Sequence, residues 1–387
     1  MKVLSRALDS FWRPTLMSVR GWALAAVISN AVIITTGAAV RLSSSGLGCD
    51  DWPTCTTSSL IASHVTGQSL LNTWIEFSNR LLNYPLVGIA GLVFIACWRY
   101  RPGGARRHDL VRLSSVLPLG IVAQAVVGGI VVLTKLNPAM VAVHFLLSSG
   151  LLAVAVVLHV RVAEGDGPSR PVVRPDLRVL AWLLAGATAV MLVAGTVVTG
   201  TGPLAGTEID SHGHYTTVPR FHLSLVGVTQ FHADIAWFIS ATSLALAVGL
   251  RYTQAPARAR RQAWIVVGGV VLQALIGYTQ YFFHLPAGLV WVHVAGAVLL
   301  WIAVLRLNLS TRERPSVPAA GPSSGNGTTG EDTQLPADSD GVTVGRPVPV
   351  SGPVPGAGPV PGASPVPAGG PVPASSPMPA DTTAALP

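Results

Sequence analysis

The chain has 387 residues, of which 50% are hydrophobic and only 11% are charged. A soluble protein carries about 25% charged residues, so this composition excludes an ordinary cytosolic protein. Three cysteines exclude a disulfide-rich secreted scaffold, although they leave room for one bridge. The net charge of +8 comes from short basic clusters between long apolar runs, which is typical of a membrane protein and not of a nucleic-acid-binding one.

Eight apolar runs are long enough to cross a lipid bilayer, which takes about 20 residues each. The basic residues at the N-terminus precede a full-length run, which favours a retained first helix over a cleaved signal peptide. The predicted spans are Trp22–Val40, Phe77–Trp98, Leu113–Leu133, Ala139–Val160, Leu180–Thr199, Phe231–Leu250, Trp264–Phe283 and Leu289–Leu307.

Lysine and arginine are distributed unevenly between the two sides of these spans. Of the 25 such residues, 21 fall on the side of the N-terminus, and only Arg41, Arg80, Lys135 and Arg220 fall on the other. Because positive charge stays in the cytoplasm, we expect both termini inside and the loops 42–75 and 200–230 outside.

The second half of the chain repeats the first. Shifting the third and fourth spans by 149 positions, without a gap, places them on the seventh and eighth spans. The first and fifth spans match more loosely, through Gly37–Val40 and Gly195–Val198. Since each repeat has an even number of spans, both halves share one topology, and the predicted fold is all-α with two pseudo-symmetric four-helix bundles. The pairs matched at 149 positions are Gly120 with Gly269, Val122 with Val271, Gln124 with Gln273, Ala125 with Ala274, Gly128 with Gly277, Val143 with Val292 and His144 with His293.

These features divide the chain into five segments. We expect a cytoplasmic N-terminal segment (1–21), an N-terminal bundle (22–162), a cytoplasmic linker (163–178), a C-terminal bundle (179–309) and a tail (310–387). The tail repeats Pro-Val-Pro with Gly, Ala and Ser, a composition that favours extended segments and cannot bury a core. It is predicted to be a disordered cytoplasmic tail, with a docking motif for a partner as the alternative.

Three histidines lie near the outer ends of predicted spans, namely His144, His232 and His293. Ionisable groups inside a membrane are costly, so each is a candidate for function, although an isolated histidine more often only bonds to a neighbouring helix. His144 and His293 are repeat partners. His232 and His293 offer two imidazoles at similar depth in one bundle, which is how a haem iron is held through two axial ligands.

The first half departs from this pattern. A shift of 153 positions from His232 leads to Asn79, and asparagine is a poor ligand for haem iron. What remains there is His144 together with Glu76, which lies one turn before Asn79 on the same helix face. We therefore expect the second half to hold a redox cofactor tightly, and the first half to hold a reactive substrate with one iron face open.

The first outer loop contains two cysteines, Cys49 and Cys55, with five residues between them. On the oxidising side of a bacterial-type membrane such a pair can close a small disulfide loop. Metal binding by this pair is disfavoured, because two further ligands of matching spacing are missing. Cys97, at the cytoplasmic end of the second span, is predicted to be a buried free thiol.

Three features together resemble the haem A synthase family, in its actinobacterial form. They are the segment Gly37–Cys55 with its Gly-Leu-Gly-Cys and Trp-Pro-Thr-Cys motifs, the element Glu76–Arg80, and the four-plus-four repeat with paired histidines. The resemblance covers most of residues 20–310 and excludes the tail. It departs from the family at Asn79, where the usual Glu-x-x-His-Arg carries a histidine, and in lacking the second cysteine pair that some members carry.

The resemblance implies an oxidoreductase that converts the C8 methyl group of haem O into a formyl group, giving haem A for the terminal oxidase. It implies haem b on His232 and His293, and haem O on His144, with the catalytic residue Glu76. Glu76 would accept a proton or stabilise positive charge at the methyl carbon. The alternative is a surface pair with Arg80 on the next helical turn.

Further expectations concern the surroundings of these sites. Arg41 and Arg80 are candidates for contacts with haem propionates, with snorkelling to lipid headgroups as the alternative. The implied setting is a bacterial plasma membrane, with haem O synthase and the cytochrome oxidase assembly machinery as partners, and the resemblance leaves homo-oligomerisation open. Two other functions remain as alternatives to the synthase. A membrane b-type cytochrome that carries electrons would require four helix histidines. A transporter built from parallel repeats would require broken helices and charged residues at the middle of the membrane.

Overall fold

The computed structural model describes residues 14–49, 51–56, 59–62, 69–209 and 215–315. The predicted N-terminal segment up to residue 13 and the predicted tail from residue 316 onward lie outside this range. Within it, eight helical spans are long and apolar enough to cross a membrane, which confirms a mostly helical, multi-pass membrane protein.

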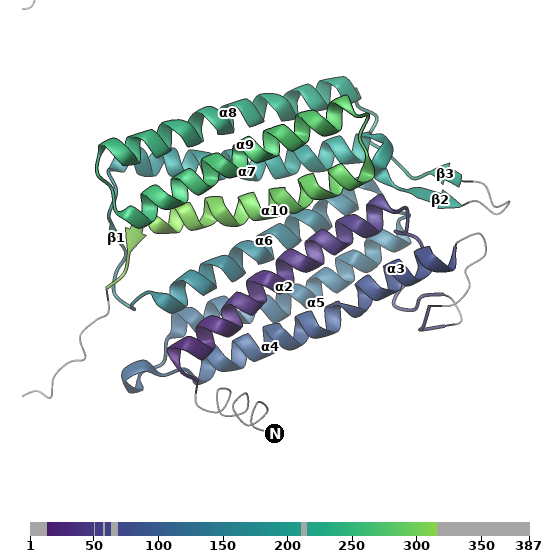
Figure 1. Ribbon diagram of the computed structural model, residues 1–387. Coiled ribbons are helices and arrows are strands. Elements are labelled where there is room, and N and C mark those ends of the chain that lie inside the picture. Colours follow the sequence, from purple (N-terminus) through teal and green to yellow (C-terminus); the bar gives the residue numbers. More distant parts are fainter. Residues whose placement is uncertain (1–13, 50, 57–58, 63–68, 210–214, 316–387) are drawn as a thin grey trace, which may run out of the picture. The chain divides into compact units, whose positions relative to one another are not determined.

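The long helices follow one another along the chain, and the longest connections come after α2 and after α7 (Figure 1). They are α2 (Leu16–Leu42), α3 (Leu70–Leu81), α4 (Asn83–Arg99), α5 (His108–Leu133), α6 (Pro138–Ala163), α7 (Pro175–Thr201), α8 (Leu225–Tyr252), α9 (Ala257–Phe282) and α10 (Ala287–Ser310). The shorter elements are η1 (Pro102–Gly104), β1 (Arg170–Pro171), η2 (Pro203–Ala205), β2 (Thr207–Ile209), β3 (Tyr215–Thr217) and β4 (Arg312–Glu313). Strand β1 pairs antiparallel with β4, and β2 pairs antiparallel with β3.

Several helices begin well before the apolar run that predicts them. Helix α3 starts at Leu70 and α8 at Leu225, and in each the preceding serine caps the helix by accepting a hydrogen bond from a backbone N–H in the first turn. Hydropathy detects only the apolar middle of a span, whereas the capping residue decides where the helix begins. The observed spans are therefore longer than the predicted ones.

The second span consists of α3 and α4, which are separated at Leu82. Proline at position 85 has no N–H to donate to the carbonyl one turn earlier, which explains the interruption. Leu82 itself keeps right-handed helical angles (φ −63°, ψ −15°), so the span continues across a local break.

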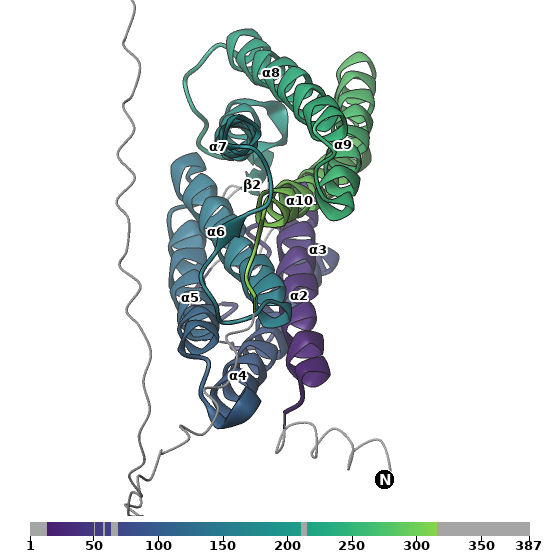
Figure 2. The same cartoon turned by 90° about the vertical axis from the view of Figure 1, so that its left-hand side faces the viewer.

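Each half of the chain forms a closed ring of four helical spans. In the first half α2 packs on α4 and α6, and α5 packs on the same two helices. In the second half α7 and α9 each pack on both α8 and α10. Figure 2 shows the two groups of helices from one end, with α7 nearly end-on and the others seen obliquely. In each ring the second and fourth spans face each other diagonally, so side chains from them meet near the bundle axis.

The predicted repeat extends to details of the backbone. After α5, the two residues Lys135 and Leu136 have positive φ (54° and 57°). Their repeat partners after α9, 149 positions further on, are His284 and Leu285, and both of these have φ of 59°. The Leu136 N–H donates to the carbonyl of Val131, and the Leu285 N–H donates in the same way to that of Gln280. The same left-handed turn thus links the third and fourth spans of both halves.

The two halves contact each other through α10, which packs on α2 and α6, and through α6, which packs on α7. Arg41 of α2 donates hydrogen bonds to Thr199 and Ala205 of the second half. The indole N–H of Trp291 donates to the carbonyl of Thr35 over 3.0 Å, and that of Trp301 donates to the carbonyl of Ser149 over 3.1 Å. We call the end of the bundles where α2 finishes and α3, α6, α8 and α10 begin the disulfide end.

Candidate functional site

His232 and His293 face each other inside the second bundle. They project from α8 and α10, which are diagonal in the ring, and their ring centroids lie 6.4 Å apart. A metal–imidazole bond is about 2 Å long, as zinc sites show, so two such bonds together with the two ring radii fill this separation. The Nδ1 atoms of both rings are buried and have no hydrogen-bond partner among the described residues. The pair therefore fits an iron held between two axial histidines.

His144 occupies the same place in the first bundle. It is the seventh residue of α6, as His293 is of α10, and both lie about 10 Å from the helix start. Its Nδ1 is also buried and unpaired among the described residues. Gln124 of α5 donates a hydrogen bond to the carbonyl of His144 over 3.3 Å, which holds this turn of α6 against α5.

A glycine of the preceding span lies beside each of the three histidines. A Cβ atom added to Gly128 would come within 3.2 Å of the His144 ring, and one added to Gly277 or Gly195 would come within 3.5 Å of the His293 or His232 ring. The absence of a side chain at these points lets each histidine ring lie close against the backbone of the preceding span. In the sequence, the only signal for these glycines is the match of Gly128 with Gly277 and of Gly37 with Gly195.

His159 shows that an unpaired ring nitrogen alone does not define the site. Its Nδ1 is buried without a partner too, yet it lies in the last turns of α6, at the end opposite to the disulfide end. No glycine among the described residues packs against it. Also among the described residues, no group of three His, Cys, Asp or Glu side chains is arranged to hold a bare metal ion.

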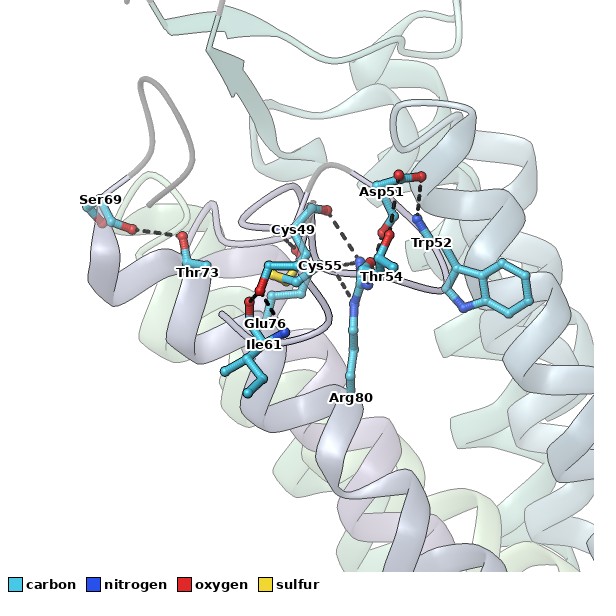
Figure 3. The surroundings of a disulfide bond; sticks show 11 residues. Cys49, Asp51, Trp52, Thr54, Cys55, Ile61, Ser69, Thr73, Glu76 and Arg80 are labelled. Atoms are coloured by element: carbon cyan, nitrogen blue, oxygen red, sulfur yellow. Dashed lines mark hydrogen bonds and ion pairs between the residues drawn. A yellow bond between two sulfur atoms is a disulfide. The ribbon is translucent and has the colours of Figure 1, made fainter. Parts of the chain in front are cut away.

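The predicted disulfide is present in the loop between α2 and α3. Cys49 and Cys55 are bonded, their Cα atoms are 4.5 Å apart, and both residues are almost fully buried. Cys97 is a buried free cysteine. Figure 3 shows the bridge lying against α3, with Glu76 and Arg80 directed toward it.

Glu76 and Arg80 clamp this loop onto α3. The Glu76 carboxylate, which is 6% exposed, accepts a hydrogen bond from the backbone N–H of Cys49 over 2.8 Å. Arg80 donates to the same carboxylate over 2.6 and 3.0 Å, and to the backbone carbonyls of Cys49, Asp51 and Thr54 over 2.9–3.3 Å. The two residues are indeed paired along the helix, but Glu76 is buried, Arg80 is half-buried, and both reach across to the loop (Figure 3).

Two glycines allow the loop to approach the helices this closely. A Cβ atom on Gly48 would lie 2.5 Å from the carbonyl oxygen of Asn72 in α3, and one on Gly129 would lie 2.4 Å from the Trp52 ring. Gly129 of α5 follows Gly128, which faces His144, so the loop reaches the neighbourhood of the His144 site. The second half has Tyr278 in the place of Gly129. Sequence reasoning missed this contact, because it joins two segments far apart in the chain.

Arg41 and Arg80 both lie at the disulfide end, and every guanidinium nitrogen of each donates to a protein oxygen. Arg41 joins the two halves, whereas Arg80 holds the disulfide loop. Contact of either arginine with a propionate stays a prediction.

The fold and the site define a multi-pass membrane protein with a paired-histidine site in one of two repeated bundles. A family model described as cytochrome oxidase assembly protein, COX15-CtaA, matches residues 20–305. The chain therefore belongs to the COX15-CtaA family.

Individual relatives agree with this assignment. The chain is 25% identical to a "Heme A synthase" of Shewanella oneidensis over 319 residues, covering 73% of this chain and 93% of the relative. It is 26% identical to one of Methylorubrum extorquens over 353 residues, covering 80% and 90%. A third, from Lysinibacillus sphaericus, is 35% identical over 150 residues, and this match spans 38% of the chain and about half (46%) of the relative.

Proposed function

We propose that this protein is a haem A synthase, an oxidoreductase that converts the C8 methyl group of haem O into a formyl group. The family match and the names of the relatives support this function. The observation that carries it is the asymmetry between two repeated sites: a histidine pair 6.4 Å apart in the second bundle, and a single histidine at the equivalent depth in the first.

In this proposal the second bundle (179–309) holds haem b and the first (22–162) holds haem O. His232 and His293 would hold haem b through its iron, and the haem would supply one-electron transfer. The glycines beside the rings, Gly195 and Gly277, let the two imidazoles lie close against α7 and α9. His144 would hold the iron of haem O, and Gly128 lets its ring lie close against α5.

Glu76 is the proposed reactive carboxylate of the first bundle. A buried carboxylate within a membrane helix is rare and costly, which favours a functional role. It would accept a proton during oxidation of the methyl group, or stabilise positive charge at the methyl carbon. Its hydrogen bond from Cys49 gives it a second task, because it also holds the disulfide loop.

The proposed setting is a bacterial plasma membrane with both termini in the cytoplasm and the disulfide end outside. Haem O synthase would deliver the substrate, and assembly of the terminal oxidase would consume the product. The excess of Lys and Arg on the side of the N-terminus supports this orientation, and a disulfide at the opposite end suits an oxidising compartment.

The experiment is expression in bacteria that make haem O but no haem A, followed by extraction and chromatography of the haems. The wild-type protein should yield haem A, and the Glu76→Gln variant should accumulate haem O or a hydroxylated intermediate while keeping its haem b. His293→Ala should lose the low-spin haem b spectrum, whereas the control His159→Ala should keep it. If cells that express the wild-type protein insert it normally into the membrane but contain no haem A, the proposed function is refuted.

A further inference from the structure

Four helix positions at the disulfide end are equivalent in the two bundles, and only three of them carry histidine. His144 corresponds to His293, and Asn79 corresponds to His232. The inference below concerns the fourth position, Asn79, and it rests on the proposed function in that the first bundle takes a haem.

The structure supports the equivalence of Asn79 and His232 independently of the sequence shift. Asn79 lies on the second span of its bundle, diagonal to the span of His144, as His232 lies diagonal to His293. A Cβ atom on Gly37 of α2 would lie 4.0 Å from the Asn79 amide nitrogen, just as one on Gly195 of α7 would face the His232 ring. Asn79 therefore occupies the place of an axial ligand.

The Asn79 side chain also has an unused polar group at this point. Its Oδ1 atom is buried and has no hydrogen-bond partner among the described residues, and a half-turn of the amide exchanges this oxygen with the N–H group. Buried polar groups are normally paired, so an unpaired one at a candidate ligand site indicates that something else binds there. At the other three positions a buried polar atom is likewise unpaired among the described residues, namely the Nδ1 atom of His144, His232 and His293.

An asparagine cannot replace the histidine as an iron ligand. The axial ligands of haem iron are histidine, cysteine, methionine or tyrosine, and a neutral amide is not among them. The amide is also shorter than an imidazole, and it carries an N–H donor as well as the carbonyl oxygen. It therefore leaves a gap at the iron together with a group able to donate a hydrogen bond into that gap.

We propose that Asn79 keeps one face of the first-bundle haem iron open and donates a hydrogen bond from its amide to a small diatomic ligand bound there, opposite His144. Asn79 is thus a positioning residue for the small ligand. The second bundle, in which His232 closes the equivalent face, binds no such ligand.

Carbon monoxide is a suitable probe, because it binds only to a ferrous haem with an open position. The full-length protein is purified with its haems from cells that supply haem O, reduced, and titrated with carbon monoxide. We expect one haem to bind the gas and the low-spin haem b to ignore it. Asn79→His should convert the first-bundle haem to a low-spin spectrum and weaken carbon monoxide binding at least tenfold, with the haem b spectrum unchanged as evidence of folding.

Two further variants make the test symmetrical. His232→Asn transplants the asparagine into the second bundle and should make haem b reactive toward carbon monoxide. Asn79→Leu removes the hydrogen bond but adds no ligand, so it should still bind carbon monoxide, with a shifted C–O stretching frequency and dissociation about tenfold faster.

Three outcomes would overturn the inference: a wild-type protein whose haems all resist carbon monoxide, an Asn79→His protein that binds it as the wild type does, or an Asn79→Leu protein with unchanged stretching frequency and dissociation. These outcomes differ from a failure of the proposed function. A protein that makes haem A with both haems closed refutes the role of Asn79 only, whereas one that binds carbon monoxide without making haem A refutes the synthase only.

Discussion

Replacing Arg80 with alanine should release the disulfide loop from α3. Three of the hydrogen bonds of Arg80 go to loop carbonyls, those of Cys49, Asp51 and Thr54. Each such bond contributes about 1 kcal/mol net, because the carbonyls can bind water once the loop opens. The docked loop should therefore be destabilised by about 3 kcal/mol, which corresponds to a roughly 100-fold larger open fraction.

The reduction rate of the disulfide measures this opening. Both cysteines are almost completely buried, so a water-soluble phosphine reaches them only when the loop opens. If closing is fast compared with reduction, the rate follows the open fraction, and Arg80→Ala should be reduced roughly 100-fold faster than the wild type. Arg80→Lys should be intermediate, because an ammonium group lacks the planar fork that reaches several carbonyls at once.

Arg41→Ala is the matched control. Arg41 is an arginine of the same end whose bonds go to Thr199 and Ala205 and not to the loop, so its loss should leave the reduction rate within about twofold of the wild type. An unchanged reduction rate in Arg80→Ala would refute the view that this side chain holds the loop closed. A Glu76→Gln protein that is reduced faster but still makes haem A would limit Glu76 to the same holding task.

Two further predictions concern the second bundle and the thiols. Gly277→Val places a side chain against the His293 ring and should abolish the low-spin haem b spectrum. The control Gly268→Val lies on the same helix with open space around it and should keep that spectrum. Equal haem content in both variants would contradict the proposed site. In denatured membranes, alkylation of Cys49 and Cys55 should require a reductant, whereas Cys97 should be labelled equally before and after the reductant is added. Free Cys49 and Cys55 thiols in mass spectra from growing cells would contradict the bridge.

Much of the fold follows from the sequence, because long apolar runs and an even repeat leave few alternatives. The repeat of 149 positions reappears in the structure as matching left-handed turns at Leu136 and Leu285. Helix starts were predicted less well, since serine caps and short polar turns extend α3 and α8 beyond their apolar middles.

The candidate site was predictable where it depends on helix periodicity and not where it depends on the path of a loop. The facing of His232 and His293 follows from depth and repeat alone, whereas the contact of Trp52 with Gly129 does not. Likewise, the pairing of Glu76 with Arg80 is visible as a four-residue spacing. The burial of Glu76 and the hydrogen bonds of Arg80 to three loop carbonyls depend on how the chain returns over α3.

The contacts between the halves have the form of a homodimer interface with twofold symmetry. Exchanging each helix with its repeat partner turns the contact of α10 with α2 into that of α6 with α7, and leaves the contact of α10 with α6 unchanged. This is the pattern of an isologous interface, in which two copies of one unit use the same surface. In a true homodimer any substitution would appear in both copies. Joining the copies in a single chain frees them to diverge, so that one can keep a histidine at 232 while the other carries an asparagine at 79.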